Sequence, residues 1–178
     1  SKKVFPKFSI LDPETTYSLP VKQLRNGIVD TFVHVMEQYF GYRDNSLISE
    51  RFAEGILKTL IEIGPRICNN PDTIDYDDRA NFMWAATMGL NKLIACGVKE
   101  DWATHNLGHE LTALYGLDHG ITLAIILPGV MEAVKDERRF KLLQYGERIW
   151  NISPLQDNAA EEAIQKTEEF FNSLGMKT

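Results

Sequence analysis

The sequence lacks the long apolar runs and the clusters of basic residues that mark several large classes of protein. No stretch approaches the ~20 consecutive apolar residues that a membrane span needs, and the N-terminal residues contain no apolar signal core. A formal net charge of -6 without any run of Lys or Arg disfavours nucleic acids and anionic membranes as partners. We therefore expect a cytoplasmic protein that acts on a small molecule.

The sequence also has few cysteines and no glycine-rich loop. The two thiols, Cys68 and Cys96, lie in apolar helical patterns with no second thiol at metal-ligand spacing, so both are predicted to be reduced and buried. The sequence contains neither a glycine-rich pyrophosphate loop nor an internal repeat. With 44% apolar residues, 178 residues are enough to bury one core.

What the sequence does contain is helical periodicity. Three prolines around Phe8–Leu11 predict a short extended segment over residues 5–20 with a turn at Asp12-Pro13. From Pro20 onward, apolar residues recur at steps of three or four, which predicts an all-α multi-helix bundle. The helices are expected over residues 20–40, 46–63 (with a kink or stop at Gly64-Pro65), 75–96, 102–115, 121–127, 137–150 and 158–174.

The four histidines carry the main functional signal: His34, His105, His109 and His119. Asp30 precedes His34 by one helical turn, so a carboxylate and an imidazole share one helix face, and His105 and His109 repeat this spacing. His119 follows across a turn at the start of an apolar helix, where an uncompensated imidazole is costly. One carboxylate and three imidazoles can hold a divalent metal, Fe(II) or Zn(II), with a position open for substrate.

Other readings of these residues remain open at this point. Any single Asp-x-x-x-His is most often a solvated pair, and His105-x-x-x-His109 lacks the glutamate that a zinc protease places after its first histidine. A di-iron carboxylate bundle is disfavoured because paired Glu-x-x-His motifs are missing. Glu37 is interpreted as structural, and Trp84, Trp102 and Trp150 as core residues.

Two stretches resemble a known family. Residues 26–37 (NGIVDTFVHVME) look like the first metal-binding helix of the iron-containing (group III) alcohol dehydrogenases. Residues 101–120 (DWATHNLGHELTALYGLDHG) resemble the family signature, particularly that of its butanol dehydrogenase and NADPH-dependent aldehyde reductase branch. The resemblance extends over nearly the whole chain.

The resemblance implies the fold and the roles of the site residues. It implies the metal-binding domain of a dehydroquinate synthase-like fold, with residues 1–19 as a crossover segment from a nucleotide domain and residues 20–178 as a C-terminally incomplete helical domain. His109 matches a histidine near the nicotinamide and the reacting carbon. The four implied metal ligands are Asp30, His34, His105 and His119.

The implied activity is hydride transfer between NAD(P)H, bound mainly by the nucleotide domain, and an aldehyde held at the metal. The resemblance favours NADP over NAD, small aldehydes or alcohols as substrates, and allows a homodimer. The alternative is a non-catalytic helical domain, which either binds a metal or is an interaction module in which the histidines merely pack.

Overall fold

The computed structural model describes residues 6–41, 45–70, 73 and 75–178. Within these residues it contains seven α-helices, one short 3-10 helix and no strand, which confirms the predicted all-α fold. Their bounds are η1 Pro13–Thr16, α1 Val21–Tyr39, α2 Leu47–Asn69, α3 Tyr76–Leu90, α4 Ala103–Tyr115, α5 His119–Ala133, α6 Arg139–Trp150 and α7 Ala159–Ser173. No described helix is both long and apolar enough to cross a bilayer.

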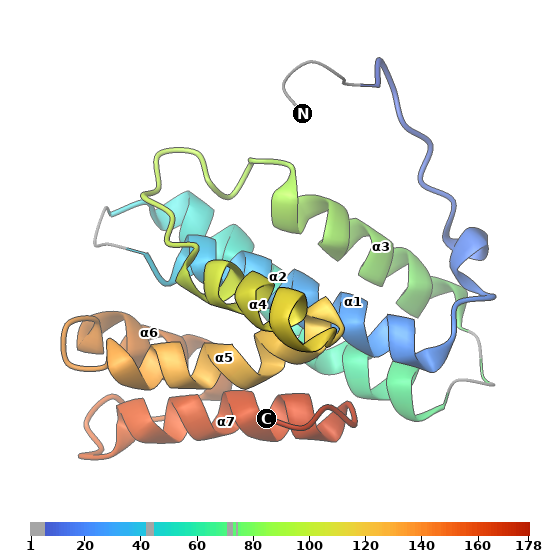
Figure 1. The fold of residues 1–178 in the computed structure, drawn as a ribbon. Helices are drawn as coiled ribbons and strands as arrows, with labels where there is room; N and C mark the ends of the chain where they lie inside the picture. Colours follow the sequence, from blue (N-terminus) through green and yellow to red (C-terminus); the bar gives the residue numbers. More distant parts are fainter. Residues whose placement is uncertain (1–5, 42–44, 71–72, 74) are drawn as a thin grey trace.

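Helix α1 is the centre of the bundle (Figure 1). It contacts α2, α3, α4 and α5, while α7 packs on α5 and α6. Leu24, Ile28 and Phe32 of α1 are fully buried because they recur at four-residue steps on one face. The ring of Phe32 meets Phe170 and Phe171 of α7 at 5.2 and 5.4 Å between centroids. The first metal-ligand candidates therefore lie on the least exposed helix of the fold.

The N-terminal segment follows the prediction in part. Asp12 accepts a hydrogen bond from the amide of Glu14 and opens η1, as expected for the turn at Asp12-Pro13. Residues 8–11 lie outside any helix, and Phe8 and Ile10 are about four-fifths exposed. The predicted extended segment begins at Phe5, which lies outside the described residues.

Several details of the helices differ from the sequence prediction. Helix α2 continues through Gly64-Pro65 to Asn69, and Pro65 lies inside it. Helix α3 ends at Leu90 instead of reaching residue 96. Trp84 on this helix is 58% exposed, so its assignment to the core is wrong. Cys68 is buried as predicted, but Cys96, in the segment after α3, is exposed.

Candidate metal centre

Helix α1 presents Asp30 and His34 on one face, one turn apart. Nδ1 of His34 lies 2.8 Å from the backbone oxygen of Asp30 and 3.3 Å from its Oδ1. Because a carbonyl oxygen only accepts hydrogen bonds, this geometry favours the tautomer in which Nδ1 carries the hydrogen. Nε2 of His34 then keeps a lone pair that can bind a cation.

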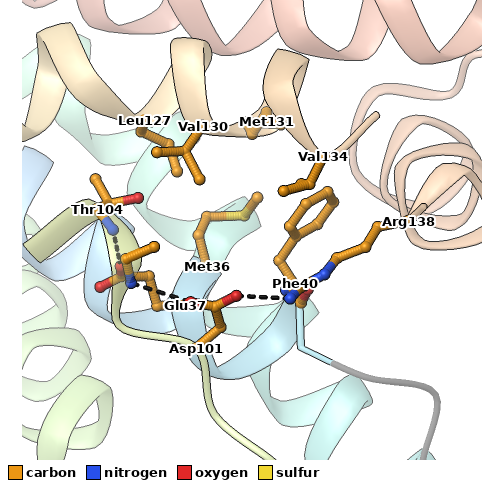
Figure 2. A pocket seen from close by; sticks show the side chains of 11 residues that line it. Met36, Glu37, Phe40, Asp101, Thr104, Leu127, Val130, Met131, Val134 and Arg138 are labelled. Carbon is orange, nitrogen blue, oxygen red and sulfur yellow. Dashed lines mark hydrogen bonds and ion pairs between the residues drawn. The ribbon is translucent and has the colours of Figure 1, made fainter. Parts of the chain in front are cut away.

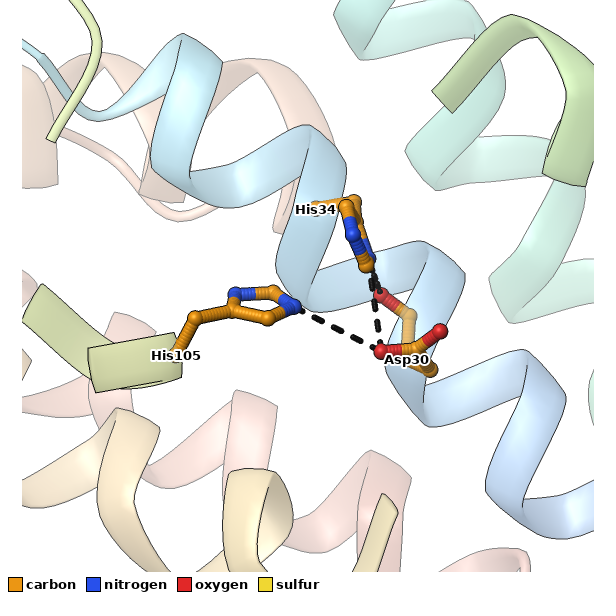
Figure 3. A group of neighbouring side chains, drawn as sticks. All are labelled: Asp30, His34 and His105. Atoms are coloured by element: carbon orange, nitrogen blue, oxygen red, sulfur yellow. Dashed lines mark hydrogen bonds and ion pairs between the residues drawn. The ribbon is translucent and has the colours of Figure 1, made fainter. Parts of the chain in front are cut away.

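His105 and His119 reach the same point from two further helices. Gly116 adopts a left-handed conformation with φ of +66° and ends α4, so the chain turns back within two residues and α5 begins at His119. Nε2 of His105 and Nε2 of His119 each lie 3.5 Å from Oδ1 of Asp30. Figure 3 shows the rings of His34 and His105 both directed toward Asp30. Three helices thus bring the four predicted ligand residues together around Asp30, with Nε2 of His105, Nε2 of His119 and Nδ1 of His34 near its Oδ1.

The geometry fits a divalent cation better than it fits hydrogen bonding. Oδ1 of Asp30 and Nε2 of His105 are both buried, and neither has a hydrogen-bond partner among the described residues. Ligand atoms at about 2.0–2.2 Å from a tetrahedral cation lie about 3.4 Å from one another. The separations of 3.5 Å match that spacing. Potential ligand atoms of Asp30, His34 and His105 all lie within 4.8 Å of one another, and His119 joins them through its contact with Asp30.

The electrostatics of the cluster favour positive charge at its centre. Burial would lower the pKa of His105, but its contacts with the carboxylates of Asp30 and Glu37 raise that pKa to about 9. Burial would raise the pKa of Asp30, but His105 and His34 hold it well below its usual range. Burial lowers the pKa of His119; the carboxylate of Asp30 opposes this shift, and the neighbouring histidines add to it. A lowered pKa favours the neutral imidazole, which is the form that binds a metal.

The cluster is closed on one side and open on the other. The exposed fraction of the side chains rises from 7% for His105 to 32% for His119 and 37% for Asp30. The open side borders a polar hollow of about 340 Å³ between the start of α1 and the start of α5. Its lining includes Gln23, Asn26, Asp118 and His119. A small polar molecule can approach the cluster from this hollow.

Comparison with known proteins identifies the family. Residues 25–178 match the model of the Fe-containing alcohol dehydrogenase family, C-terminal part. The chain belongs to this family. The NADPH-dependent aldehyde reductase YqhD of Escherichia coli is 54% identical over all of this chain and 46% of its own length. The NADH-dependent butanol dehydrogenase A of Clostridium acetobutylicum is 40% identical over 96% of this chain and 44% of its own.

Solved structures of Fe-containing alcohol dehydrogenases share the fold. The substrate- and cofactor-free aldehyde reductase YqhD of E. coli superposes with a TM-score of 0.93 at 53% identity, over 98% of this chain and 46% of that one. The NADH-dependent butanol dehydrogenase A of Thermotoga maritima gives a TM-score of 0.89 at 33% identity, over 98% of this chain and 44% of that one. The chain therefore spans about half the length of the relatives it matches.

His109, which the family resemblance sets apart from the ligands, lies beside the cluster. Its ring stacks on that of His119, with centroids 4.7 Å apart and an angle of 6° between the planes. It is 6.3 Å from the ring of His105, and its residue is exposed. Neither His109 nor His119 belongs to the group Asp30, His34 and His105, whose potential ligand atoms lie within 4.8 Å of one another, but Nε2 of His119 lies 3.5 Å from Oδ1 of Asp30. His109 faces the cluster from the side that solvent or a cofactor can reach.

Two contributors to the site were not recognised from the sequence. Glu37, interpreted as structural, is buried with its carboxylate against the ring of His105. Asp118 does not cap its own helix α5 but binds Asn26 at 2.9 Å and Lys22 at 2.8 Å on α1. The sequence feature that could have indicated a role for Glu37 is its position on the same helix face as Asp30 and His34, one turn after His34. No sequence spacing predicts the contacts of Asp118.

Proposed function

We propose that this chain is the metal-binding part of an NAD(P)-dependent alcohol dehydrogenase that reduces small aldehydes. The proposed ligands of the cation, Fe(II) or Zn(II), are Asp30, His34, His105 and His119. The observation that carries the proposal is the buried Oδ1 of Asp30, which has no hydrogen-bond partner among the described residues and has Nε2 of His105 and Nε2 of His119 at 3.5 Å. The family assignment supports the activity, because relatives in this family include aldehyde reductases and butanol dehydrogenases.

We propose a separate role in the reaction for each residue of the site. A divalent cation bound at this cluster would supply Lewis-acid polarisation of the aldehyde oxygen, and a reduced nicotinamide would supply the hydride. Asp30 offsets part of the positive charge, and the buried ring of His105 keeps the inner side of the site closed to water. His119 and Asp30 border the hollow through which we propose the substrate enters.

The proposal includes a separate nucleotide-binding domain that binds the nicotinamide. Support comes from the relatives, which this chain matches over less than half of their length, and from the lack of a glycine-rich pyrophosphate loop in its sequence. Residues 1–19 are proposed as the crossover segment and residues 20–178 as the helical metal-binding domain. We propose NADPH as the preferred reductant, because the relative with 54% identity is named for it. A homodimer is also compatible with this arrangement.

The activity is tested with the protein expressed from its natural reading frame. After the protein is loaded with Fe²⁺ or Zn²⁺, we expect it to oxidise NADPH when butanal is added, which is measured as a loss of NADPH absorbance. We expect no turnover after a chelator has removed the metal. A protein that binds about one equivalent of metal without turnover favours the alternative of a non-catalytic metal-binding domain. A folded protein that binds no divalent metal contradicts the whole proposal.

His109 is proposed to contact the nicotinamide or to relay the proton, because its exposed ring stacks on His119. Replacing it with alanine is expected to lower kcat on the order of 100-fold, within the range of acid–base groups, while metal content stays at the wild-type level. The matched control is Asn106→Ala, which alters an exposed residue on the same helix. Loss of metal in His109→Ala would instead identify His109 as a ligand.

A further inference from the structure

Glu37 is a buried carboxylate that makes three hydrogen bonds at the edge of the metal cluster. It lies on α1, one turn beyond His34, and is 4% exposed. Its Oε1 accepts from the backbone amides of Thr104 at 2.6 Å and His105 at 3.2 Å. Its Oε2 is paired with Nδ1 of the His105 ring. Both oxygens are therefore directed at the first turn of α4.

The carboxylate of Glu37 accepts hydrogen bonds from backbone amides in the first turn of α4 that have no acceptor within the helix. Trp102 occupies the N-cap position and provides no side-chain cap, while the amide of Ala103 donates to Asp101. The next two amides have Glu37 as their acceptor. A carboxylate at the positive end of a helix dipole satisfies free amides and is stabilised by the dipole. Glu37 thus caps α4 from another helix, 67 residues earlier in the chain.

The same carboxylate determines which nitrogen of His105 carries the hydrogen. An ionised carboxylate only accepts hydrogen bonds, so Nδ1 of His105 must donate to it. Nε2 of a neutral His105 then has a free lone pair, and this atom lies 3.5 Å from Oδ1 of Asp30 with no hydrogen-bond partner in the part of the chain that the structure describes. The tautomer that Glu37 requires is the one that a cation at Nε2 requires.

The surroundings hold Glu37 in place (Figure 2). It lines a small cavity of about 20 Å³ whose other walls are mainly apolar side chains: Met36, Phe40, Leu127, Val130, Met131 and Val134. The amide of Asp101 donates to the backbone oxygen of Glu37 at 3.1 Å. Asp101 is in turn paired at 2.6 Å with Arg138, which donates to the backbone oxygen of Phe40. A hydrogen bond in such a water-poor place is stronger than one in solvent.

We propose that Glu37 is a positioning residue of the metal site, which fixes both the helix that carries His105 and the tautomer and orientation of its ring. The inference rests on the proposed function, because it assigns Glu37 a role toward the cation. Metal-binding histidines commonly donate their second ring N–H to a carboxylate, and loss of such a partner costs about 10–100-fold in metal affinity.

Glu37→Gln separates positioning of the ring from capping of the helix. The side-chain oxygen of glutamine can still accept from the amides of Thr104 and His105, but its NH₂ group is then directed at Nδ1. Nδ1 must accept, the hydrogen of His105 moves to Nε2, and the metal-binding lone pair is lost. We expect affinity for Zn²⁺ to fall about 10–100-fold in competition with a chromophoric chelator. The melting temperature of the metal-free variant should stay within about 4 °C of wild type.

Glu54→Gln is the matched control. Glu54 is also a buried carboxylate, 6% exposed, and it binds Tyr39, Arg51 and Arg148 away from the cluster. This variant removes the same charge and should keep the wild-type affinity for Zn²⁺. Glu37→Gln with wild-type affinity would overturn the inference and leave the proposed function intact. A wild-type chain that binds no Zn²⁺ would overturn the proposed function first.

A measurement on the wild-type chain does not depend on the folding of any variant. In ¹⁵N-detected spectra of the Zn²⁺-loaded chain, His105 should carry its hydrogen on Nδ1 and show the shift of a metal-bound nitrogen at Nε2. A hydrogen on Nε2, or metal at Nδ1, would contradict the role assigned to Glu37.

Discussion

Replacing Asp30 with asparagine is expected to lower the affinity of the chain for Zn²⁺ or Fe²⁺ by about 100-fold, which corresponds to about 2.7 kcal/mol. Oδ1 of Asp30 lies 3.5 Å from Nε2 of both His105 and His119, and 3.3 Å from Nδ1 of His34 on its own helix. Asparagine keeps the size of the side chain but removes the only negative charge among the four proposed ligands. A neutral amide oxygen is a much weaker ligand for these metals than a carboxylate. The measurement is metal content after dialysis, followed by competition with a chelator.

The metal-free Asp30→Asn chain should still fold. The side chain of Asp30 is 37% exposed, and the core of α1 lies on residues such as Leu24, Ile28 and Phe32, which the substitution does not touch. Asp77→Asn, on the exposed first turn of α3, removes the same charge from a residue outside the cluster and should bind metal as wild type does. Equal affinities for the two variants would mean that the cluster is not the metal site.

The periodic helices could be predicted because their faces are visible in the sequence. The start of α1 at Pro20, the turn after α4 at Gly116 and the amphipathic α6 and α7 follow from local rules of residue spacing, proline and glycine. These rules depend on neighbours within a few positions. They were sufficient for the all-α fold, which is confirmed.

The interruptions of helices could not be predicted from such rules. Helix α2 continues through Gly64-Pro65 because tertiary packing holds it: a Cβ on Gly64 would lie 3.1 Å from Leu174 and 3.4 Å from Ile28. After α3 the prediction fails in the opposite sense, because it extends the helix to residue 96 whereas the helix ends at Leu90. Lys92 adopts a positive φ of 75° there, although the apolar pattern continues. In both places the decisive contacts or dihedrals lie outside the local pattern.

The candidate site was predictable to the extent that its chemistry is local. Asp30 with His34, and His105 with His109, are pairs at helical spacing, and the family resemblance distinguishes His105 from His109. Glu37 acts on His105 across 68 residues, and Asn26 acts on Asp118 across 92. No spacing rule relates such positions. The structure brings the four proposed ligands together, and their binding of a metal remains a prediction.

The second large effect is expected at Gly120, where α5 approaches α1. A Cβ added at this position would lie 2.6 Å from Cα and 2.9 Å from the backbone oxygen of Asn26. Both atoms belong to the main chain, so Gly120→Ala must push the start of α5 away from α1. The movement also strains the bonds of Asp118 to Asn26 and Lys22, which hold the two helices together. Overpacking of this kind typically lowers the free energy of unfolding by about 1–3 kcal/mol.

His119 is the neighbour of Gly120, so the same movement should reach the metal site. Its Nε2 lies 3.5 Å from Oδ1 of Asp30, and a shift of about 1 Å removes it from the spacing that a common cation requires. We expect affinity for Zn²⁺ to fall at least about tenfold, on the scale of losing a well-placed ligand partner. Urea denaturation of the metal-free chain and Zn²⁺ competition measure the two effects separately.

Gly129→Ala is the control within the same helix. No atom of the described residues lies within 4 Å of a Cβ placed on Gly129, and Gly129 is exposed. Alanine is favoured over glycine in a helix by up to about 1 kcal/mol, so this variant should be as stable as wild type or slightly more stable, with unchanged affinity for Zn²⁺. If Gly120→Ala behaves like Gly129→Ala, the close approach of α5 to α1 does not position His119. Loss of affinity in Gly120→Ala alone would show that the backbone contact between Gly120 and Asn26 sets the distance from His119 to Asp30.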